Sequence, residues 1–399
     1  MEFGKLTEYL NSLEARFGIP ALDCKITRNH EVVFRHMSGF SDYAKKHPVS
    51  NRDLYGLYSA TKVITMVAVM QLMESGKLGL YDELRRFLPE FANLRVADSF
   101  VLKLPLQFPI PWPGPDSPCH LAHSQIRIID LMSMTSGLSY NLGAEILIKA
   151  RADSHDKATT REMVAAMARM PLLYEPRTRW SYSLAHDVLA AVVEAVSGMR
   201  FGDYLLKNVF GPLGLTDFHF VVDAEQKKRI SAQYVHDGGS GKNIPAPYDN
   251  ATGFIRLTEN YESGGAGLIA SVDAYSAVID ALANGGIAAN GHRLLQEDTI
   301  RLFSTNYLTG DMLKDFQTPG GDARKGYGYG LGVRVHIDPS TAKTPAGEFG
   351  WDGAAGAYVL IDPVNHISLF YAQQVTGLQQ AFEIIHPEIR DLAYQAMGF

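Results

Sequence analysis

The densest hydrophobic pattern in the 399-residue chain lies in residues 63–73, where apolar side chains occupy nearly every face of a predicted helix. A helix without a polar face is normally buried in a protein core. Residues 3–17 differ, because phenylalanine and leucine recur there at helical spacing on one side only. That spacing predicts an amphipathic helix at the surface. The chain is therefore expected to fold around the buried helix.

Strand-like runs occur near both ends of the chain. Residues 21–27 and 31–37 predict one hairpin, and residues 357–361 and 367–371 predict another. Residues 124–215, between them, are mostly helical in pattern. This order predicts an α+β fold, in which an antiparallel sheet takes strands from both chain ends and is flanked by helices.

A mostly helical domain is expected as an insertion into this sheet domain. A chain of this length typically forms two domains or one domain with a large insertion. We expect a sheet domain of residues 1–80 and 260–399, a helical domain of residues 81–259, and an active site between them. Residues 105–118 are rich in proline and aromatic residues and cannot form regular structure. They form either a surface loop or a rigid wall of a substrate pocket that includes Trp112.

Composition and charge exclude several classes of protein. Charged residues make up 20% of the chain with interspersed signs and a formal net charge of -6, which disfavours nucleic-acid and polybasic membrane-binding proteins. No apolar run is long enough for a transmembrane helix, and the first residues do not form a signal-peptide pattern. Cys24 and Cys119 do not make a disulfide framework. We expect a cytoplasmic enzyme, whose oligomeric state the sequence leaves open.

Candidate chemistry begins at the entrance of the buried helix, where Ser59 and Lys62 are three residues apart. At this spacing both side chains share one helix face, and the helix N-terminus favours a developing alkoxide. Such a serine can act as a nucleophile without a histidine. The same spacing recurs at residues 154–157 and 340–343, in polar or loop-like segments. The motif alone therefore leaves open that Ser59 is an ordinary helix cap.

Two further segments carry candidate groups for the same reaction. Tyr182 precedes a predicted helix, where a tyrosine is usually a packing residue. If its hydroxyl met Ser59 and Lys62, it could move a proton, and the three groups would titrate as a unit. Residues 348–354 are glycine-rich and enter a predicted strand, so their backbone can approach closely. The backbone N–H groups of Ala354 and Ser59 would then form an oxyanion hole.

The order and context of these segments resemble the serine β-lactamases and penicillin-binding-protein-like hydrolases, in the branch around class C β-lactamases. Residues 59–62 resemble the first motif, Tyr182-Ser183-Leu184 the Tyr-x-Asn motif, and Trp351-Asp352-Gly353 the Lys/His-Thr-Gly motif. Further similarity lies in three supporting stretches: residues 131–138, 264–271 and 327–332.

Two departures from this family pattern bear on the substrate. Leu184 stands where the family has an asparagine that holds the substrate amide, and Trp351 stands where it has a cationic or polar residue. Both changes remove hydrogen bonds that would hold an anionic β-lactam. We therefore expect an apolar pocket that favours esters, as in the family VIII carboxylesterases and their acyltransferase relatives, which the chain resembles most.

The resemblance implies a role for each residue. Ser59 would attack the ester carbonyl, Lys62 and Tyr182 would relay the proton, and the N–H groups of Ser59 and Ala354 would hold the oxyanion. The expected substrate contacts are Trp351, Gly353, Leu184 and Trp112. The expected partner is a small ester with a short-to-medium acyl group, without a metal or cofactor.

Other functions stay open from the sequence. A β-lactamase, a D-amino-acid peptidase or an acyltransferase would use the same residues, and a non-catalytic binding domain would not need them. An α/β-hydrolase is disfavoured, since the chain has no G-x-S-x-G motif. Cys119, His120 and His123 could contribute to a metal site but lack a clear further ligand. His186, four residues after Tyr182, is either a hydrogen-bonded polar residue or a base.

Overall fold

A seven-stranded antiparallel sheet forms one half of the molecule, with strand order β10-β11-β12-β13-β14-β1-β2. The computed structural model describes residues 1–100, 109–246, 257–318, 321 and 324–399. The strands are β1 (Ala21–Arg28), β2 (Glu31–Gly39), β10 (Tyr327–Tyr329), β11 (Arg334–His336), β12 (Phe349–Gly350), β13 (Tyr358–Asp362) and β14 (Ile367–Ala372).

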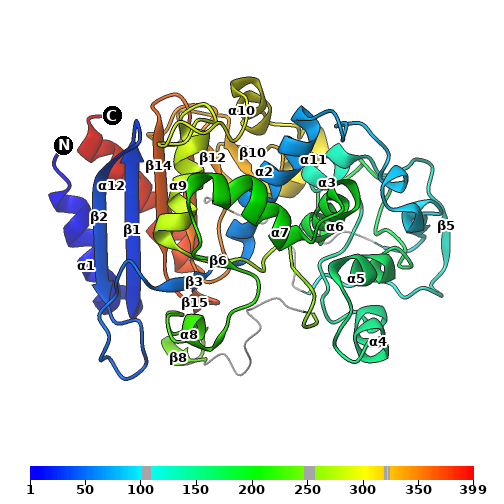
Figure 1. Cartoon of the computed structure of the whole chain (residues 1–399), viewed down its shortest axis with the longest axis horizontal. Helices are drawn as coiled ribbons and strands as arrows, with labels where there is room; N and C mark the ends of the chain where they lie inside the picture. The colour runs from blue at the N-terminus through cyan, green and yellow to red at the C-terminus, as the bar shows by residue number, and fades with distance from the viewer. Residues whose placement is uncertain (101–108, 247–256, 319–320, 322–323) are drawn as a thin grey trace.

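Strands from the two ends of the chain meet in the middle of this sheet, where β1 pairs with β14. The two predicted hairpins are present as β1–β2 and β13–β14. The termini lie close together at one end of the molecule (Figure 1). These features confirm the predicted α+β fold.

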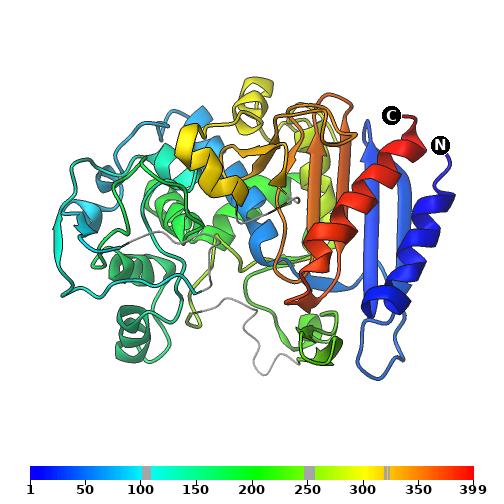
Figure 2. The ribbon, with the colours of Figure 1, turned by 180° about the vertical axis from the view of Figure 1, so that it is seen from behind.

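Helices cover both faces of the sheet. Helices α1 (Gly4–Phe17) and α12 (His386–Met397) lie side by side on one face (Figure 2). The leucines predicted for the apolar side of α1 are buried there with residues of β1, β14 and α12. Helix α9 (Val272–Ala283) packs on the opposite face (Figure 1). The sheet is therefore the middle layer of this half.

Helix α2 (Thr61–Glu74) is the buried helix that the hydrophobic pattern predicts. Its residues are buried from Thr61 to Met70, and it packs against α6 (Ala185–Ser197) in the larger hydrophobic core. Burying such apolar side chains is the main favourable term in folding. The helix follows directly on a 3₁₀ turn, Tyr58–Ala60, which contains Ser59.

The remaining elements are shorter. The other α-helices are α3 (Ile128–Met132), α4 (Glu145–Asp153), α5 (Thr160–Met167), α7 (Phe201–Leu205), α8 (Ala224–Lys227), α10 (Glu297–Phe303) and α11 (Gly310–Gln317). The other strands are β3 (Leu54–Gly56), β4 (Arg95–Ala97), β5 (Cys119–Leu121), β6 (Phe218–His219), β7 (Tyr234–Asp237), β8 (Lys242–Pro245), β9 (Ile269–Ser271) and β15 (Val375–Thr376). They form three small sheets: β3-β9-β6, β15-β7-β8 and β4-β5.

Among the described helices, none is long and apolar enough to span a membrane.

Candidate active site

The turn that carries Ser59 is held tightly at the entrance of α2. Tyr58 has a positive φ of 47°, a conformation that costs energy for a residue with a side chain. Its hydroxyl donates a hydrogen bond to Gln233 Oε1 at 2.8 Å, and the hydroxyl of Tyr275 donates to the carbonyl of Ala60 at 2.8 Å. The N-cap residue of α2 is Ala60, so Ser59 is not the cap of that helix. The turn therefore presents Ser59 as a fixed side chain.

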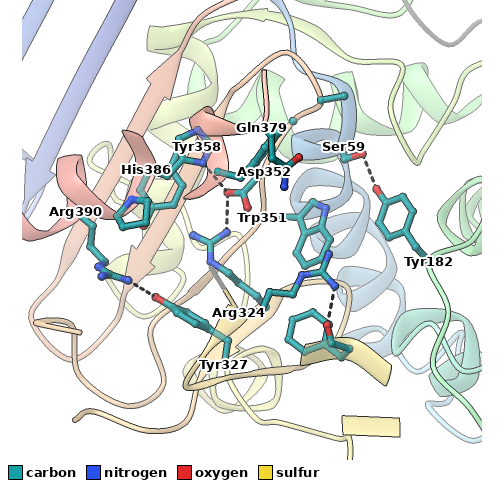
Figure 3. A pocket seen from close by; sticks show the side chains of 16 residues that line it. Ser59, Tyr182, Arg324, Tyr327, Trp351, Asp352, Tyr358, Gln379, His386 and Arg390 are labelled. Atoms are coloured by element: carbon teal, nitrogen blue, oxygen red, sulfur yellow. Dashed lines mark hydrogen bonds and ion pairs between the residues drawn. The ribbon is translucent and has the colours of Figure 1, made fainter. Parts of the chain in front are cut away.

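Tyr182 lies directly against Ser59. Its hydroxyl donates a hydrogen bond to Ser59 Oγ at 2.5 Å (Figure 3). Its ring packs between Tyr140, at a centroid distance of 5.1 Å, and Trp351, at 6.0 Å and nearly parallel. Aromatic packing on both sides leaves the phenol little freedom to turn away. The hydroxyl is thus positioned to exchange a proton with Ser59.

Lys62 is fully buried beneath this pair. Its Nζ donates a hydrogen bond to the carbonyl oxygen of Gly265 at 2.7 Å and lies 4.6 Å from the centroid of the Tyr182 ring. Within the described part of the chain, no hydrogen bond joins Lys62 Nζ to Ser59 Oγ. Tyr182 thus links the two residues, because its ring lies beside Lys62 Nζ and its hydroxyl bonds to Ser59 Oγ. The sequence spacing suggested that Lys62 and Ser59 interact directly.

The carbonyl that holds Lys62 belongs to a segment fixed by Asp187, which the sequence analysis did not single out. Asp187 Oδ1 accepts hydrogen bonds from the hydroxyls of Tyr261 and Ser263, both at 2.6 Å. A side chain at Gly264 would collide with Ala190 and the carbonyl of His186, so the close packing requires glycine. The resemblance at residues 264–271 was a signal for this segment, but not for its contact with Lys62.

A cavity of about 460 Å³ opens beside Ser59 and Tyr182. Five of the predicted site residues line it together: Ser59, Tyr182, Trp351, Gly353 and Ala354. Gly353 packs so closely on the turn before Ser59 that a Cβ there would overlap the carbonyl oxygen of Leu57. The third motif and the nucleophile turn thus form one wall of the cavity.

Two predicted substrate contacts lie elsewhere. Leu184 is completely buried at the start of α6, and Trp112 is buried with its Nε1 donating to the carbonyl of Pro171 at 2.9 Å. Neither lines the cavity beside Ser59. In the predicted wall formed by residues 105–118, residues 105–108 lie outside the described part of the chain.

The cavity is charged, so the prediction of an apolar pocket is wrong in this respect. Arg324, Arg334 and Arg390 all line it. Arg334 forms an ion pair with Asp352 at 2.9 Å, and Arg390 forms one with Asp391 at 2.7 Å. The apolar character of Trp351 in the third motif did not reveal these cations, because they come from other segments.

Arg324 differs from the other two arginines. Its guanidinium donates to the carbonyl of Phe316 at 2.7 Å and lies over the rings of Phe316, at 4.7 Å, and Trp351, at 5.9 Å (Figure 3). Of the carboxylates in the described residues, none lies within ion-pair distance of it. Burial lowers the pKa of Arg324 to about 10, which still leaves it charged at neutral pH. This arginine is therefore the cation of the cavity that is available to a negatively charged group of a substrate.

His186 does not face the cavity. It is completely buried on α6, and neither ring nitrogen has a hydrogen-bond partner among the described residues. Burial, with a smaller contribution from the nearby Lys62, holds the pKa of His186 well below its usual value. The histidine is therefore neutral, and it is neither the hydrogen-bonded residue nor the base that the sequence suggested.

A sequence model of the beta-lactamase family matches residues 8–394. The chain belongs to the beta-lactamase family. It is 29% identical to Esterase EstB from Burkholderia gladioli over 86% of this chain and 83% of that protein. It is 27% identical to lovastatin esterase from Penicillium rubens over 81% of this chain and 80% of that protein.

Among solved structures, this member of the beta-lactamase family is similar to EstCE1, described as a hydrolase with promiscuous acyltransferase activity. The TM-score is 0.76 at 24% identity, with 98% of each chain covered, which shows a common fold. The family match and the esterase relatives confirm the predicted class, a serine hydrolase of the β-lactamase fold.

Proposed function

We propose that this enzyme cleaves carboxylic esters through an acyl-enzyme formed on Ser59. The observation that carries the proposal is the 2.5 Å hydrogen bond between Tyr182 Oη and Ser59 Oγ at the wall of the cavity. A serine becomes an effective nucleophile when an adjacent group removes its proton. Tyr182 is the group in position to do so.

In this mechanism Lys62 acts through the tyrosine. Tyr182 accepts the proton of Ser59 as a phenolate and becomes a neutral phenol, and the Lys62 ammonium lies 4.6 Å from the centroid of that ring. A fixed positive charge in a buried site stabilises the phenolate form without reorganisation. Tyr182 then donates the proton to the leaving alkoxide, which departs as an alcohol and leaves the acyl group bonded to Ser59 Oγ.

The oxyanion is held by the backbone N–H groups of Ser59 and Ala354. Both residues line the cavity, and the contact of Gly353 with the turn before Ser59 keeps the two N–H groups on one wall. A water molecule gives a proton to Tyr182 and attacks the carbonyl of the acyl-enzyme. Tyr182 returns that proton to Ser59 Oγ as the bond between Ser59 Oγ and the acyl group breaks, and the carboxylic acid is released. The cavity volume suits a small ester with a short-to-medium acyl group.

Transfer of the acyl group to an alcohol in place of water would use the same residues. EstCE1, a hydrolase with promiscuous acyltransferase activity, has the same fold. Cleavage of β-lactams is the second candidate, because the cavity contains the cation that Trp351 does not supply. We place the enzyme in the cytoplasm, on the sequence expectation alone.

The test is hydrolysis of p-nitrophenyl butyrate and of nitrocefin by the wild type and by Ser59→Ala. We expect strong ester turnover that Ser59→Ala abolishes, and weak nitrocefin cleavage. Ser340→Ala is the matched control, because Ser340 belongs to another Ser-x-x-Lys spacing and its hydroxyl donates a hydrogen bond to Asp338, two residues away. We expect this variant to keep full activity. Mass spectrometry of the ester-treated wild type locates the acyl group on residue 59. Full activity in Ser59→Ala would refute the proposal, and dominant nitrocefin turnover would make β-lactam cleavage the function.

A further inference from the structure

A cluster of two histidines and a glutamate lies far from the cavity. His120 is in β5, His123 follows that strand, and Glu175 precedes the segment that leads to Tyr182. Strand β5 lies at the end of the molecule opposite the seven-stranded sheet (Figure 1). None of the three residues lines the catalytic cavity. From the sequence, Cys119, His120 and His123 could contribute to a metal site but lacked a clear further ligand, and the structure places Glu175 beside the two histidines.

The three side chains already stand at the spacing of metal ligands. His120 Nε2 and His123 Nδ1 each lie 3.2 Å from the same carboxylate oxygen, Glu175 Oε1. The three potential ligand atoms all lie within 4.8 Å of one another. A tetrahedral zinc ion with bonds of about 2.0–2.1 Å places neighbouring ligand atoms roughly 3.3–3.4 Å apart. An ion could therefore enter with small side-chain movements.

The surroundings orient these ligands. Asp98 Oδ1 lies 2.7 Å from His120 Nδ1, an arrangement in which the proton sits on Nδ1 and the lone pair of Nε2 points at Glu175. The backbone N–H of His123 lies 3.1 Å from both oxygens of Glu175 and fixes that carboxylate. An imidazole lone pair facing a carboxylate oxygen at 3.2 Å repels it unless a cation or a proton lies between them.

We propose that His120, His123 and Glu175 bind a divalent transition-metal ion, of which Zn²⁺ fits the ligands best. Imidazole and carboxylate are ordinary zinc ligands, and the exposure of the His123 side chain leaves room for water as a fourth ligand. The ion would tie β5 to the segment before Tyr182. Its role is structural, since it lies away from the cavity.

The competing explanation for the same contacts is a proton. Hydrogen bonds to Asp98 and Glu175 raise the pKa of His120, so a doubly protonated ring could bridge the two carboxylates. Zinc and the second proton compete for Nε2, and zinc affinity should fall as the pH is lowered through the titration of His120. The experiment must therefore detect the metal itself.

The test is isothermal titration of the full-length, chelator-treated protein with ZnCl₂. We expect one saturable site, loss of binding in the double variant His120→Ala/His123→Ala, and binding at least tenfold weaker in Glu175→Gln. Asp98→Asn removes only the residue that orients His120 and should weaken binding about 10- to 100-fold. His47→Ala is the matched control, because His47 is also exposed and lies 3.9 Å from a carboxylate, and it should bind like the wild type.

Two further readouts separate this site from the catalytic one. Zinc should raise the melting temperature of the wild type but not of the double variant. The rate of p-nitrophenyl butyrate hydrolysis should be equal with and without zinc, whichever substrate the enzyme prefers. Absence of saturable binding in the wild type, or equal binding in the double variant, would overturn the proposal and leave the proton-bridged histidine as the explanation.

Discussion

Replacing Tyr182 with phenylalanine tests the proton transfer most directly, because it removes one hydroxyl and little else. The ring would keep its contacts with Tyr140 and Trp351, while Ser59 Oγ would lose its 2.5 Å hydrogen bond. Proton transfer by a positioned side chain typically contributes about 10²–10⁴-fold. We therefore expect kcat/KM to fall by about 10²–10⁴-fold, which corresponds to roughly 3–5 kcal/mol of transition-state stabilisation. Most of the loss should lie in kcat, since the shape of the cavity is retained.

The assay is steady-state hydrolysis of p-nitrophenyl butyrate, with Ser59→Ala as the inactive reference. Tyr394→Phe is the matched control, because that buried hydroxyl also donates to an oxygen, Asp362 Oδ2 at 2.6 Å, but lies in α12 away from Ser59. It should lose stability, by about 1 kcal/mol, and keep its activity. If Tyr182→Phe retained more than about a third of the wild-type kcat/KM while Ser59→Ala stayed inactive, Tyr182 would not be the proton-transfer group.

Two further predictions concern the charges of the site. Arg324→Gln should lower the preference for a negatively charged ester, p-nitrophenyl hemisuccinate, over the neutral butyrate by about 10- to 100-fold in kcat/KM, the worth of a charge-assisted hydrogen bond. Arg85→Gln, at an exposed arginine, is the control. If the ratio of kcat/KM for the hemisuccinate to that for the butyrate were unchanged in Arg324→Gln, Arg324 would not bind the negative charge of the ester. Burial lowers the pKa of His386 to about 4 in the folded protein. As the pH is lowered below the ordinary histidine pKa of about 6.5, the unfolded chain therefore binds a proton that the folded protein does not. The free energy of unfolding should fall by up to about 3 kcal/mol between pH 6.5 and pH 4. Urea unfolding across that range should show that the free energy of unfolding falls less with pH in His386→Gln than in the wild type. An equal dependence on pH in the two proteins would refute this account.

The sequence predicted the elements whose signals are local. The hairpins β1–β2 and β13–β14 are continuous runs of strand-forming residues, and α2 is apolar on all sides, so each could be located without knowing its neighbours. The apposition of Ser59 and Tyr182 was inferred only because two short motifs kept a familiar order. Their contact is a product of tertiary packing, in which Tyr140 and Trp351 hold the Tyr182 ring.

The contacts that the sequence did not predict join segments far apart in the chain. Lys62 bonds to a carbonyl some 200 residues away, in a segment that Asp187 fixes through Tyr261 and Ser263. No periodicity marks such a carbonyl as a lysine partner. Leu184 was placed in the pocket because its position in the motif was known, but its side chain turns into the core at the start of α6.

The arginines of the cavity also come from segments whose meeting the sequence did not predict, and they change the expected substrate. Trp351 removes a cation from the third motif, yet the guanidinium of Arg324 lies over the face of that same tryptophan. Arg334 pairs with Asp352 and, at 3.8 Å, with Glu348, and Arg390 pairs with Asp391. Among the three arginines that line the cavity, Arg324 is the one without a carboxylate at ion-pair distance in the described residues. Arg324 is partly buried and has no ion-pair partner in the described part of the chain, and such a cation is stabilised when a substrate supplies the negative charge. An ester whose carboxylate reaches the Arg324 guanidinium, over the face of Trp351, should therefore bind better than a neutral ester of equal size.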